Sequence, residues 1–429
     1  MIREFQVENF FSIKSRQILS FESKGLSADF TCHQINDNTC LNKIEVFYGA
    51  NASGKSNILF ALQTVFKMLI APRFDKKENV IGYKPFALEK DKPSYFYISF
   101  YAESIRYDYE VSFDKSSIIS EQLVYYPNGS KSLFYKREFV NDNQAVSIGF
   151  GQSLHLKKRA ENVFVSNTFN NHTVLSTIAK ASFEDDISPV SYLYNWITEH
   201  VHDVNGDVEE PKTFAEIMKD VCEDSKMKSF YLQMIKKADF NITNFDYIES
   251  ERTFTENQKK KIQQNPDFPE SFKKYLLEGK EKQVLFTNTT GSGSFDLKSS
   301  DQSSGTIEFM KRLRFLYDTI SGDHLYFLDE PEEDLHYDLF LFYLNAFLFN
   351  SSGSQIILAS HLTTLLAEDL INDNRDLVFF VEKDTNTGES QYVRGDRFGL
   401  HKNQSLYNAY KIGRLGAKPI LGSPFIISD

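Results

Sequence analysis

Cysteine is scarce in this chain, and the few cysteines present form no recognisable pattern. Only Cys32, Cys40 and Cys222 occur among 429 residues. An odd number of widely spaced cysteines argues against a disulfide framework and favours a reducing compartment. Cys32 and Cys40 flank His33, but this spacing matches no zinc-binding pattern. We therefore expect all of them to be ordinary residues.

Long apolar runs are also missing. No stretch of the sequence approaches the roughly 20 apolar residues that a membrane-spanning helix needs. The first ten residues lack the apolar segment of a signal peptide. From these two absences we expect a cytoplasmic protein that makes no membrane contact.

The sequence has no excess of basic residues. Its formal net charge of −11 argues against a general nucleic-acid coat, although a local basic patch stays open. Basic clusters occur at 157–159 and 259–261, but a run of lysines on a polar helix is usually a solvated face. DNA binding is therefore possible but not favoured. A long heptad array is missing as well, which disfavours proteins built on long coiled-coil arms.

The most informative stretch present is 45–57, where a short apolar run leads into the pattern GxxxxGKS. The run predicts a buried strand, and the residues after Ser56 have the spacing of a helix. Such a strand–loop–helix arrangement lets backbone N–H groups converge on phosphate. Gly49 and Gly54 would let the backbone wrap closely, Lys55 would reach the β- and γ-phosphates, and Ser56 would bind Mg²⁺. The predicted nucleotide-binding residues are Gly49, Asn51, Ala52, Ser53, Gly54, Lys55, Ser56 and Asn57.

Two later strands end in side chains suited to the same chemistry. The run 324–328 predicts a buried strand followed by Asp329 and Glu330. An aspartate there can hold Mg²⁺, and the adjacent glutamate can activate the water that attacks the γ-phosphate. The run 355–360 predicts another strand, followed by His361, which we expect to contact the γ-phosphate. Glu330 and His361 are therefore the predicted catalytic residues, and Ser56 and Asp329 the predicted Mg²⁺ ligands.

A serine- and glycine-containing segment opens a helix predicted from Ile307 to about Thr319. Ser303, Ser304 and Gly305 lie at its start, where backbone N–H groups can bind an anion. The plain alternative is that this segment only caps the helix.

The remaining chain predicts a mixed α/β protein. Strands are expected within 1–48, a helix over 58–72, and an antiparallel meander from period-two aromatic runs between Tyr95 and about Phe134. Residues 165–285 are predicted to be mostly helical, with loops at 203–207 and around Pro266. His200 and His202, with Asp203, could be metal ligands, but a loop at a helix end explains them more simply.

The order of these motifs resembles the ATP-binding-cassette class of ATPases. This resemblance implies a mixed core sheet with an antiparallel β subdomain and an inserted helical subdomain. The expected division is an N-terminal ATPase lobe over 1–160, a helical insertion over 161–290 and a C-terminal ATPase lobe over 291–429. The resemblance also implies that the protein binds ATP and Mg²⁺ and that it forms a head-to-tail dimer. In that dimer Ser303, Ser304 and Gly305 contact the partner's ATP, and the loop 332–336 joins the two sites; Asp334 departs from the usual small residue there.

A finer resemblance is to the bacterial abortive-infection family of such ATPases, which includes the ATPase component of the PARIS anti-phage system. The segments that carry it are 2–10, 84–88, 237–242, 380–384 and 410–419. The resemblance implies a homodimer or higher homo-oligomer that holds or releases a separate toxic effector, such as a nuclease, in response to a phage-encoded trigger protein. The stretch after His361 is too short for a fused nuclease domain. The alternative is a DNA-repair ATPase that clamps DNA when it dimerises.

Overall fold

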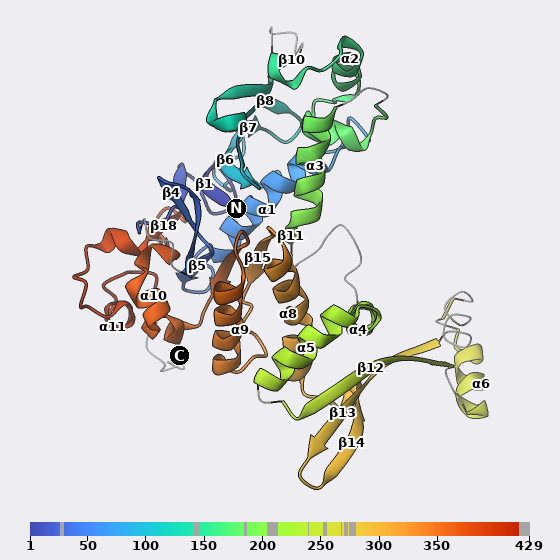
Figure 1. Cartoon of the computed structure of the whole chain (residues 1–429). Helices are drawn as coiled ribbons and strands as arrows, with labels where there is room; N and C mark the ends of the chain where they lie inside the picture. Colours follow the sequence, from blue (N-terminus) through green and yellow to red (C-terminus); the bar gives the residue numbers. More distant parts are fainter. Residues whose placement is uncertain are drawn as a thin grey trace, which may run out of the picture. The chain divides into compact units, whose positions relative to one another are not determined.

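The computed structural model describes residues 1–25, 30–139, 146–183, 187–203, 213–238, 240–251, 255–266, 268–269, 273 and 280–419. The chain forms two compact units (Figure 1). Unit 1 comprises Met1–Asn205, Thr319–Glu332 and Leu348–Asp429, and unit 2 comprises Gly206–Asp318 and Glu333–Phe347. The chain therefore leaves unit 1 twice and returns to it each time.

Unit 1 contains two sheets and a small hairpin. Its strands are β1 (Ile2–Glu8), β2 (Gln17–Ser20), β3 (Cys32–Asn36), β4 (Thr39–Asn42), β5 (Ile44–Gly49), β6 (Ser94–Ala102), β7 (Ile105–Phe113), β8 (Ile118–Tyr125), β9 (Ser132–Phe139), β10 (Val146–Phe150), β11 (Val201–Asp203), β15 (Leu325–Asp329), β16 (Gln355–Ser360), β17 (Val378–Lys383) and β18 (Ser390–Arg394). Its helices are α1 (Lys55–Ile70), α2 (Lys158–Asn167), α3 (Ser188–His200), α10 (Asp369–Asp373) and α11 (Leu406–Lys411).

The core sheet of unit 1 has the strand order β11-β15-β16-β5-β17-β18. The first five of these strands run parallel to their neighbours, and β18 is antiparallel to β17. Every residue of β5 and of β16 is buried, as expected for parallel strands covered on both faces. Because parallel strands end at one edge of the sheet, β5, β15 and β16 deliver the segments that follow them to the same place.

The second sheet of unit 1 is the predicted antiparallel meander, extended by the N-terminal strands. Its order is β10-β9-β8-β7-β6-β1-β2. Alternate residues of β7 are buried, so its aromatic side chains line one face. The α1 helix lies between the two sheets (Figure 1). Its Phe66 ring lies 5.3 Å from Phe100 on β6 and 6.3 Å from Phe327 on β15, which joins both sheets in one core.

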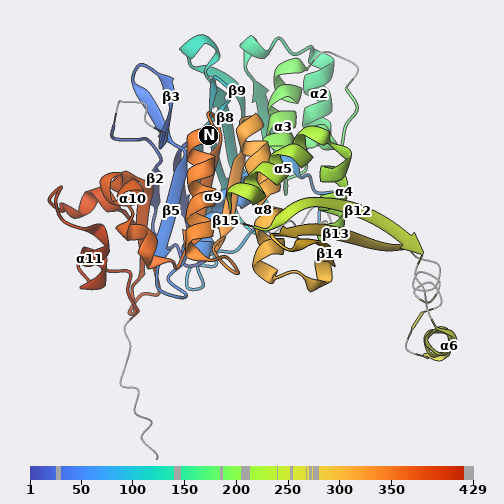
Figure 2. The same ribbon diagram turned by 60° about the horizontal axis from the view of Figure 1, so that its bottom comes forward.

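Unit 2 combines helices with a small sheet. Its elements are α4 (Phe214–Glu223), α5 (Ser225–Lys237), β12 (Ile242–Glu251), α6 (Glu256–Gln264), β13 (Lys280–Thr290), β14 (Gly293–Lys298), and most of α8 (Ser304–Ser321) and α9 (Tyr337–Asn350). The three strands pair in the order β12-β13-β14, with α4 and α5 beside them (Figure 2). Phe245 and Phe286 are buried there, and Tyr231 of α5 lies 6.1 Å from Phe245.

The predicted fold class is confirmed, with one correction in this region. Residues 165–285 were predicted to be mostly helical, yet β12 and β13 are paired strands. Val284 and Phe286 are buried while their neighbours are more exposed, so the segment has the period of a half-buried strand. Its abundant charged residues conceal that period in the sequence. The division into lobes at 1–160, 161–290 and 291–429 stays a prediction.

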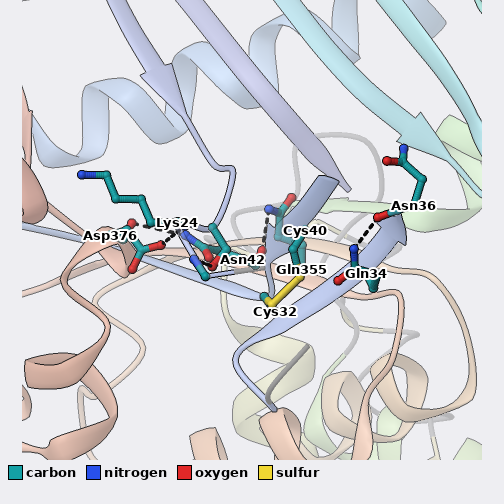
Figure 3. The surroundings of a disulfide bond; sticks show 10 residues. Lys24, Cys32, Gln34, Asn36, Cys40, Asn42, Gln355 and Asp376 are labelled. Carbon is teal, nitrogen blue, oxygen red and sulfur yellow. Dashed lines mark hydrogen bonds between the residues drawn. A yellow bond between two sulfur atoms is a disulfide. The ribbon is translucent and has the colours of Figure 1, made fainter. Parts of the chain in front are cut away.

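The cysteines require a second correction. Cys32 and Cys40 form a disulfide with a Cα–Cα distance of 6.0 Å (Figure 3). The hairpin of β3 and β4 places Cys40 opposite Gln34, diagonally across from Cys32, which brings the two side chains together. Only Cys222 is free among the described residues. The expectation that all three cysteines are ordinary residues is therefore wrong for Cys32 and Cys40.

Across the described ranges, no helix has both the length and the apolar character needed to cross a membrane.

Candidate functional site

The glycine-rich loop leaves β5 and enters α1, and two of its positions accept only glycine. A Cβ at Gly49 would collide with Ser53 Oγ and with the carbonyl oxygen of Val381 on β17. Gly54 has φ +114°, where L side chains are strained, and a Cβ there would meet the hydroxyls of Ser12 and Ser390. The backbone of the loop is therefore packed closely against its neighbours at both glycines.

The helix that follows begins earlier than predicted, at Lys55 rather than at residue 58. The first N–H groups of a helix have no partner within it and carry the positive end of its dipole. No acidic side chain lies in the first turn of this fully described helix. The start of α1 is thus suited to a phosphate group, and its N-terminal residues are the predicted ligands.

Side chains of β18 hold the loop from behind, a contact that the sequence did not reveal. Ser390 Oγ donates to the Ser53 carbonyl at 2.5 Å, and the Tyr392 hydroxyl donates to the Gly54 carbonyl at 2.7 Å. Both bonds use carbonyl oxygens, so neither of them takes up a backbone N–H group of the loop. The sequence offered no signal for them, because β18 lies far downstream.

Lys55 lies inside the loop. Its Nζ donates to the carbonyls of Gly49 at 3.0 Å and Ala50 at 3.2 Å, and it lies 3.4 Å from His361 Nδ1. Burial lowers the pKa of Lys55, while the carboxylates around it, Glu330 first, raise it. The lysine is thus poised where phosphate oxygens could replace the two carbonyls.

The structure brings the predicted catalytic residues together. Glu330 follows β15 with φ +49°, a conformation uncommon for a glutamate, and its N–H donates to the Ala359 carbonyl at 2.9 Å. Its carboxylate contacts His361 Nε2 directly. Strained backbone of this kind is often found at functional sites. The proximity of Glu330, His361 and Lys55 agrees with the expected arrangement, and their individual roles stay predictions.

Asp329 offers a test of the expected Mg²⁺. Its Oδ1 atom is buried and has no hydrogen-bond partner among the described residues. A buried carboxylate oxygen without a donor costs free energy unless a cation binds it. Carboxylate and hydroxyl oxygens are the ligands that Mg²⁺ prefers. The unpartnered oxygen of Asp329 therefore fits this ion, and the role of Ser56 as a second ligand stays a prediction.

Glu332 has a contact within unit 1 that the sequence analysis missed. Ser360 Oγ donates to Glu332 Oε1 at 2.6 Å, and the His361 N–H donates to the same atom at 2.8 Å. The resemblance to head-to-tail ATPases places Glu332 in a loop that joins the two sites of a dimer. In the structure its carboxylate fixes the backbone at the end of β16, and so the position of His361.

The loop, Glu330 and His361 border one cavity of about 800 Å³, called here the phosphate cavity. It is lined by Asn51, Ala52, Gly54, Lys55, Ser56, Asn57, Glu330, His361 and Lys383. Lys383, at the end of β17, was not predicted as a site residue, although the segment 380–384 contributed to the resemblance. A second cavity of about 850 Å³ shares Asn51, Ala52, His361 and Lys383 with it and extends to Tyr410 and 417–419.

The segment Ser303–Gly305 belongs to unit 2. Ser303 Oγ accepts a hydrogen bond from the Thr306 N–H at 3.1 Å, so the serine caps α8. A Cβ at Gly305 would lie 2.9 Å from the Asp334 carbonyl oxygen, which explains the glycine. The capping role expected as the alternative is thus present, and contact with a partner's ATP stays a prediction.

His200 and His202 form no metal site within the described ranges, which contain no cluster of three or more suitable ligands. His200 ends α3 and its Nδ1 lies 2.9 Å from the Asp323 carbonyl oxygen. His202 lies on β11, not in a loop, and its Nε2 is 2.9 Å from His324 Nδ1. The Asp203 side chain lies outside the described structure.

Comparison with known families shows the family to which the chain belongs. A family model described as "AAA domain, putative AbiEii toxin, Type IV TA system" matches residues 44–367, which is more than half of the chain and includes the loop, Asp329, Glu330 and His361. The chain belongs to this family. This AAA-domain protein therefore carries an ATPase domain of the predicted general type.

Similarity to solved structures is more distant. An SMC head bound to the C-terminal winged-helix domain of ScpA is 15% identical, with a TM-score of 0.42, and the match covers 91% of this chain and 97% of that one. The SMC head domain from Thermotoga maritima is 13% identical, with a TM-score of 0.39 and coverage of 92% and 98%. No curated protein matches the AAA-domain protein. The TM-scores of the two structural matches are too low to support an argument about function.

Proposed function

We propose that this AAA-domain protein binds ATP at the start of α1 and hydrolyses it with Glu330 as the general base. The observation that supports this most strongly is the meeting of Glu330, His361 and Lys55 beside the loop, next to the unpartnered Asp329 oxygen. In the proposed reaction, water attacks the γ-phosphorus while Glu330 accepts its proton. The bond to the β,γ-bridging oxygen breaks, and ADP and phosphate leave. Bound Mg²⁺ would supply charge neutralisation for the phosphates.

We further propose that two copies complete each site. The support is the resemblance to head-to-tail ATPases, in which a serine and glycine at a helix start contact the partner's γ-phosphate. Ser303, Ser304 and Gly305 would supply that contact in trans. Each chain would then hold half of two composite sites.

Mixing two inactive variants tests this pairing. Lys55→Ala has an intact Ser303 segment, and Ser303→Arg has an intact loop, so each alone should be inactive. A mixed dimer contains one competent site, and free exchange of subunits should restore about a quarter of the wild-type ATPase rate. Ser292→Arg, in the exposed turn between β13 and β14, is the matched control and should be active alone. A mixture as inactive as its components would contradict the head-to-tail model.

We propose that the ATPase acts in the cytoplasm in anti-phage defence and holds or releases a separate toxic effector, a nuclease or similar toxin. The support is the resemblance of the tail 410–419 and other segments to abortive-infection ATPases. The description of the matched family, which names a putative toxin and a type IV toxin–antitoxin system, points the same way. A phage-encoded protein would be the trigger.

Isolation of the complex tests this role. Tagged Glu330→Gln, purified from cells that carry its native genomic neighbourhood, should retain the effector in a fixed ratio that the mass of the complex reveals. Lys55→Ala, purified in parallel, separates partners that need bound ATP from those that do not. Recovery of Glu330→Gln without a protein partner but with DNA would contradict the defence role and favour the DNA-repair alternative.

A further inference from the structure

Two neighbouring peptide groups of the glycine-rich loop are hydrogen-bonded on their oxygen side only. The Ser53 carbonyl accepts from Ser390 at 2.5 Å, and the Gly54 carbonyl accepts from Tyr392 at 2.7 Å. The N–H groups of the same two peptide groups belong to Gly54 and Lys55. Neither N–H donates a hydrogen bond within the part of the chain that the structure describes. Both peptide groups can therefore donate to an anion while their oxygens are held by side chains.

Both side-chain donors lie on one face of β18. Ser390, Tyr392 and Arg394 are buried, and the two residues between them are exposed, as the period of a strand requires. The Tyr392 ring lies 6.1 Å from Phe47 of β5, which fixes its direction. Burial raises the pKa of the Tyr392 hydroxyl, so this group keeps its proton and remains a donor.

The Ser390 hydroxyl is the last member of a chain of hydrogen bonds. Asn57 Nδ2 donates to Ser12 Oγ at 2.6 Å, and Ser12 Oγ lies 2.7 Å from Ser390 Oγ. A serine hydroxyl has a single proton. Since the proton of Ser390 goes to the Ser53 carbonyl, Ser12 donates its own proton to Ser390. All bonds of the chain thus run in one direction, from Asn57 to the loop carbonyl.

Hydrogen bonds arranged in this way polarise one another, and a buried position strengthens the effect. Ser12, Ser53 and Ser390 are all buried. A donor on a peptide oxygen draws electron density toward that oxygen, so the N–H of the same peptide group becomes a stronger donor. A phosphate at the N–H groups of Gly54 and Lys55 would extend the chain by one more bond in the same direction.

From these observations we propose that Ser390 and Tyr392, with Ser12 behind Ser390, are positioning residues for phosphate binding. They hold and polarise the two peptide groups whose N–H groups bind the phosphates of ATP, and they act through the loop backbone without touching the nucleotide. This inference rests on the proposed ATPase function and adds to it the groups that set the affinity of the loop for phosphate.

Tyr392→Phe is the first test, because it removes the hydroxyl and keeps the buried ring. We expect the Kd values for ATP and for inorganic tripolyphosphate to rise by the same factor, about 5-fold, within the range for loss of one hydrogen bond. The two factors agree because the lost bond acts on the phosphates alone. The kcat at saturating ATP should stay at the wild-type value, since the bond serves ground state and transition state equally. Titration calorimetry measures Kd, and phosphate release measures kcat.

Two serine variants test the chain of hydroxyls. Ser390→Ala should raise both Kd values about 5-fold, because it removes the bond to the Ser53 carbonyl. Ser12→Ala removes a bond one step further from the loop and should raise them about 2-fold. This order of effects follows from the direction of the chain.

Matched controls separate positioning from a general loss of stability. Tyr83→Phe removes a hydroxyl that donates to the Lys90 carbonyl at 2.8 Å, away from the loop. Ser354→Ala removes a fully buried hydroxyl that bonds the carbonyls of Thr319 and Gly322. Both controls should bind ATP and tripolyphosphate as the wild type does.

The outcomes distinguish this inference from the ATPase function on which it rests. Wild-type affinity in Tyr392→Phe or in Ser390→Ala would overturn the inference. So would a fall in kcat as large as the rise in Kd, weaker binding of ATP alone, or an equal loss of affinity in Ser354→Ala. Failure of the wild type to bind either ligand would instead contradict the proposed function.

Discussion

Lys55→Ala should leave the protein unable to bind ATP at concentrations that saturate the wild type. Lys55 Nζ lies among the loop carbonyls, 3.4 Å from His361 Nδ1, at the place where β- and γ-phosphate oxygens are expected. Its loss removes charge-assisted hydrogen bonds, and two such bonds at about 1.5–3 kcal/mol each correspond to a loss of affinity of at least about 100-fold. Titration calorimetry with ATP and Mg²⁺ measures the effect.

The control for this variant is on the same helix. Lys67→Ala removes a lysine from the last turn of α1, far along the helix from the loop, and should bind ATP as the wild type does. ATP affinity in Lys55→Ala equal to that of Lys67→Ala would contradict the assignment of the loop as the phosphate site.

Glu330→Gln should separate ATP binding from ATP turnover. Glutamine keeps the size and the hydrogen-bonding ability of the side chain but cannot accept a proton from water. Loss of a general base costs about 10²–10⁴ in rate, so we expect turnover to fall at least 100-fold. ATP binding should persist, because Lys55 and the backbone of the loop are unchanged.

The matched control is Glu199→Gln, which makes the same chemical change at an exposed position on α3. It should hydrolyse ATP at the wild-type rate. Near-normal turnover by Glu330→Gln would point to another residue as the base, and loss of ATP binding by Glu330→Gln would point to a structural role for this glutamate.

The parts of the site that follow buried strands could be predicted from the sequence. The runs that lead into Gly49, Glu330 and His361 are almost wholly apolar, which is the pattern of parallel strands buried on both faces. Since such strands end at one edge of a sheet, their three C-terminal segments had to meet. The pairing of Asp329 with Ala359 brings the end of β15 beside the end of β16, as this reasoning expects.

The contacts that could not be predicted depend on side-chain placement between distant segments. Glu332 binds the His361 N–H only because β15 and β16 are neighbours in this register. Ser390 and Tyr392 support the loop from β18, more than 300 residues downstream. Neither contact has a local sequence pattern, because each arises from the packing of separate elements.

The two structural corrections have a similar origin. The strands β12 and β13 bury only part of one face, and their charged residues mask the period-two pattern. The bond between Cys32 and Cys40 depends on a short hairpin that turns at 37–38. In both cases the deciding information is the pairing of two segments, which composition and spacing do not contain.

The most direct test of the account is the rate of phosphate release from ATP by the purified wild-type chain and by Glu330→Gln in the presence of Mg²⁺. The account predicts steady release by the wild type and at least about 100-fold slower release by Glu330→Gln. No release by the wild type, or equal release by both proteins, would contradict the claim that Glu330 at the end of β15 catalyses ATP hydrolysis.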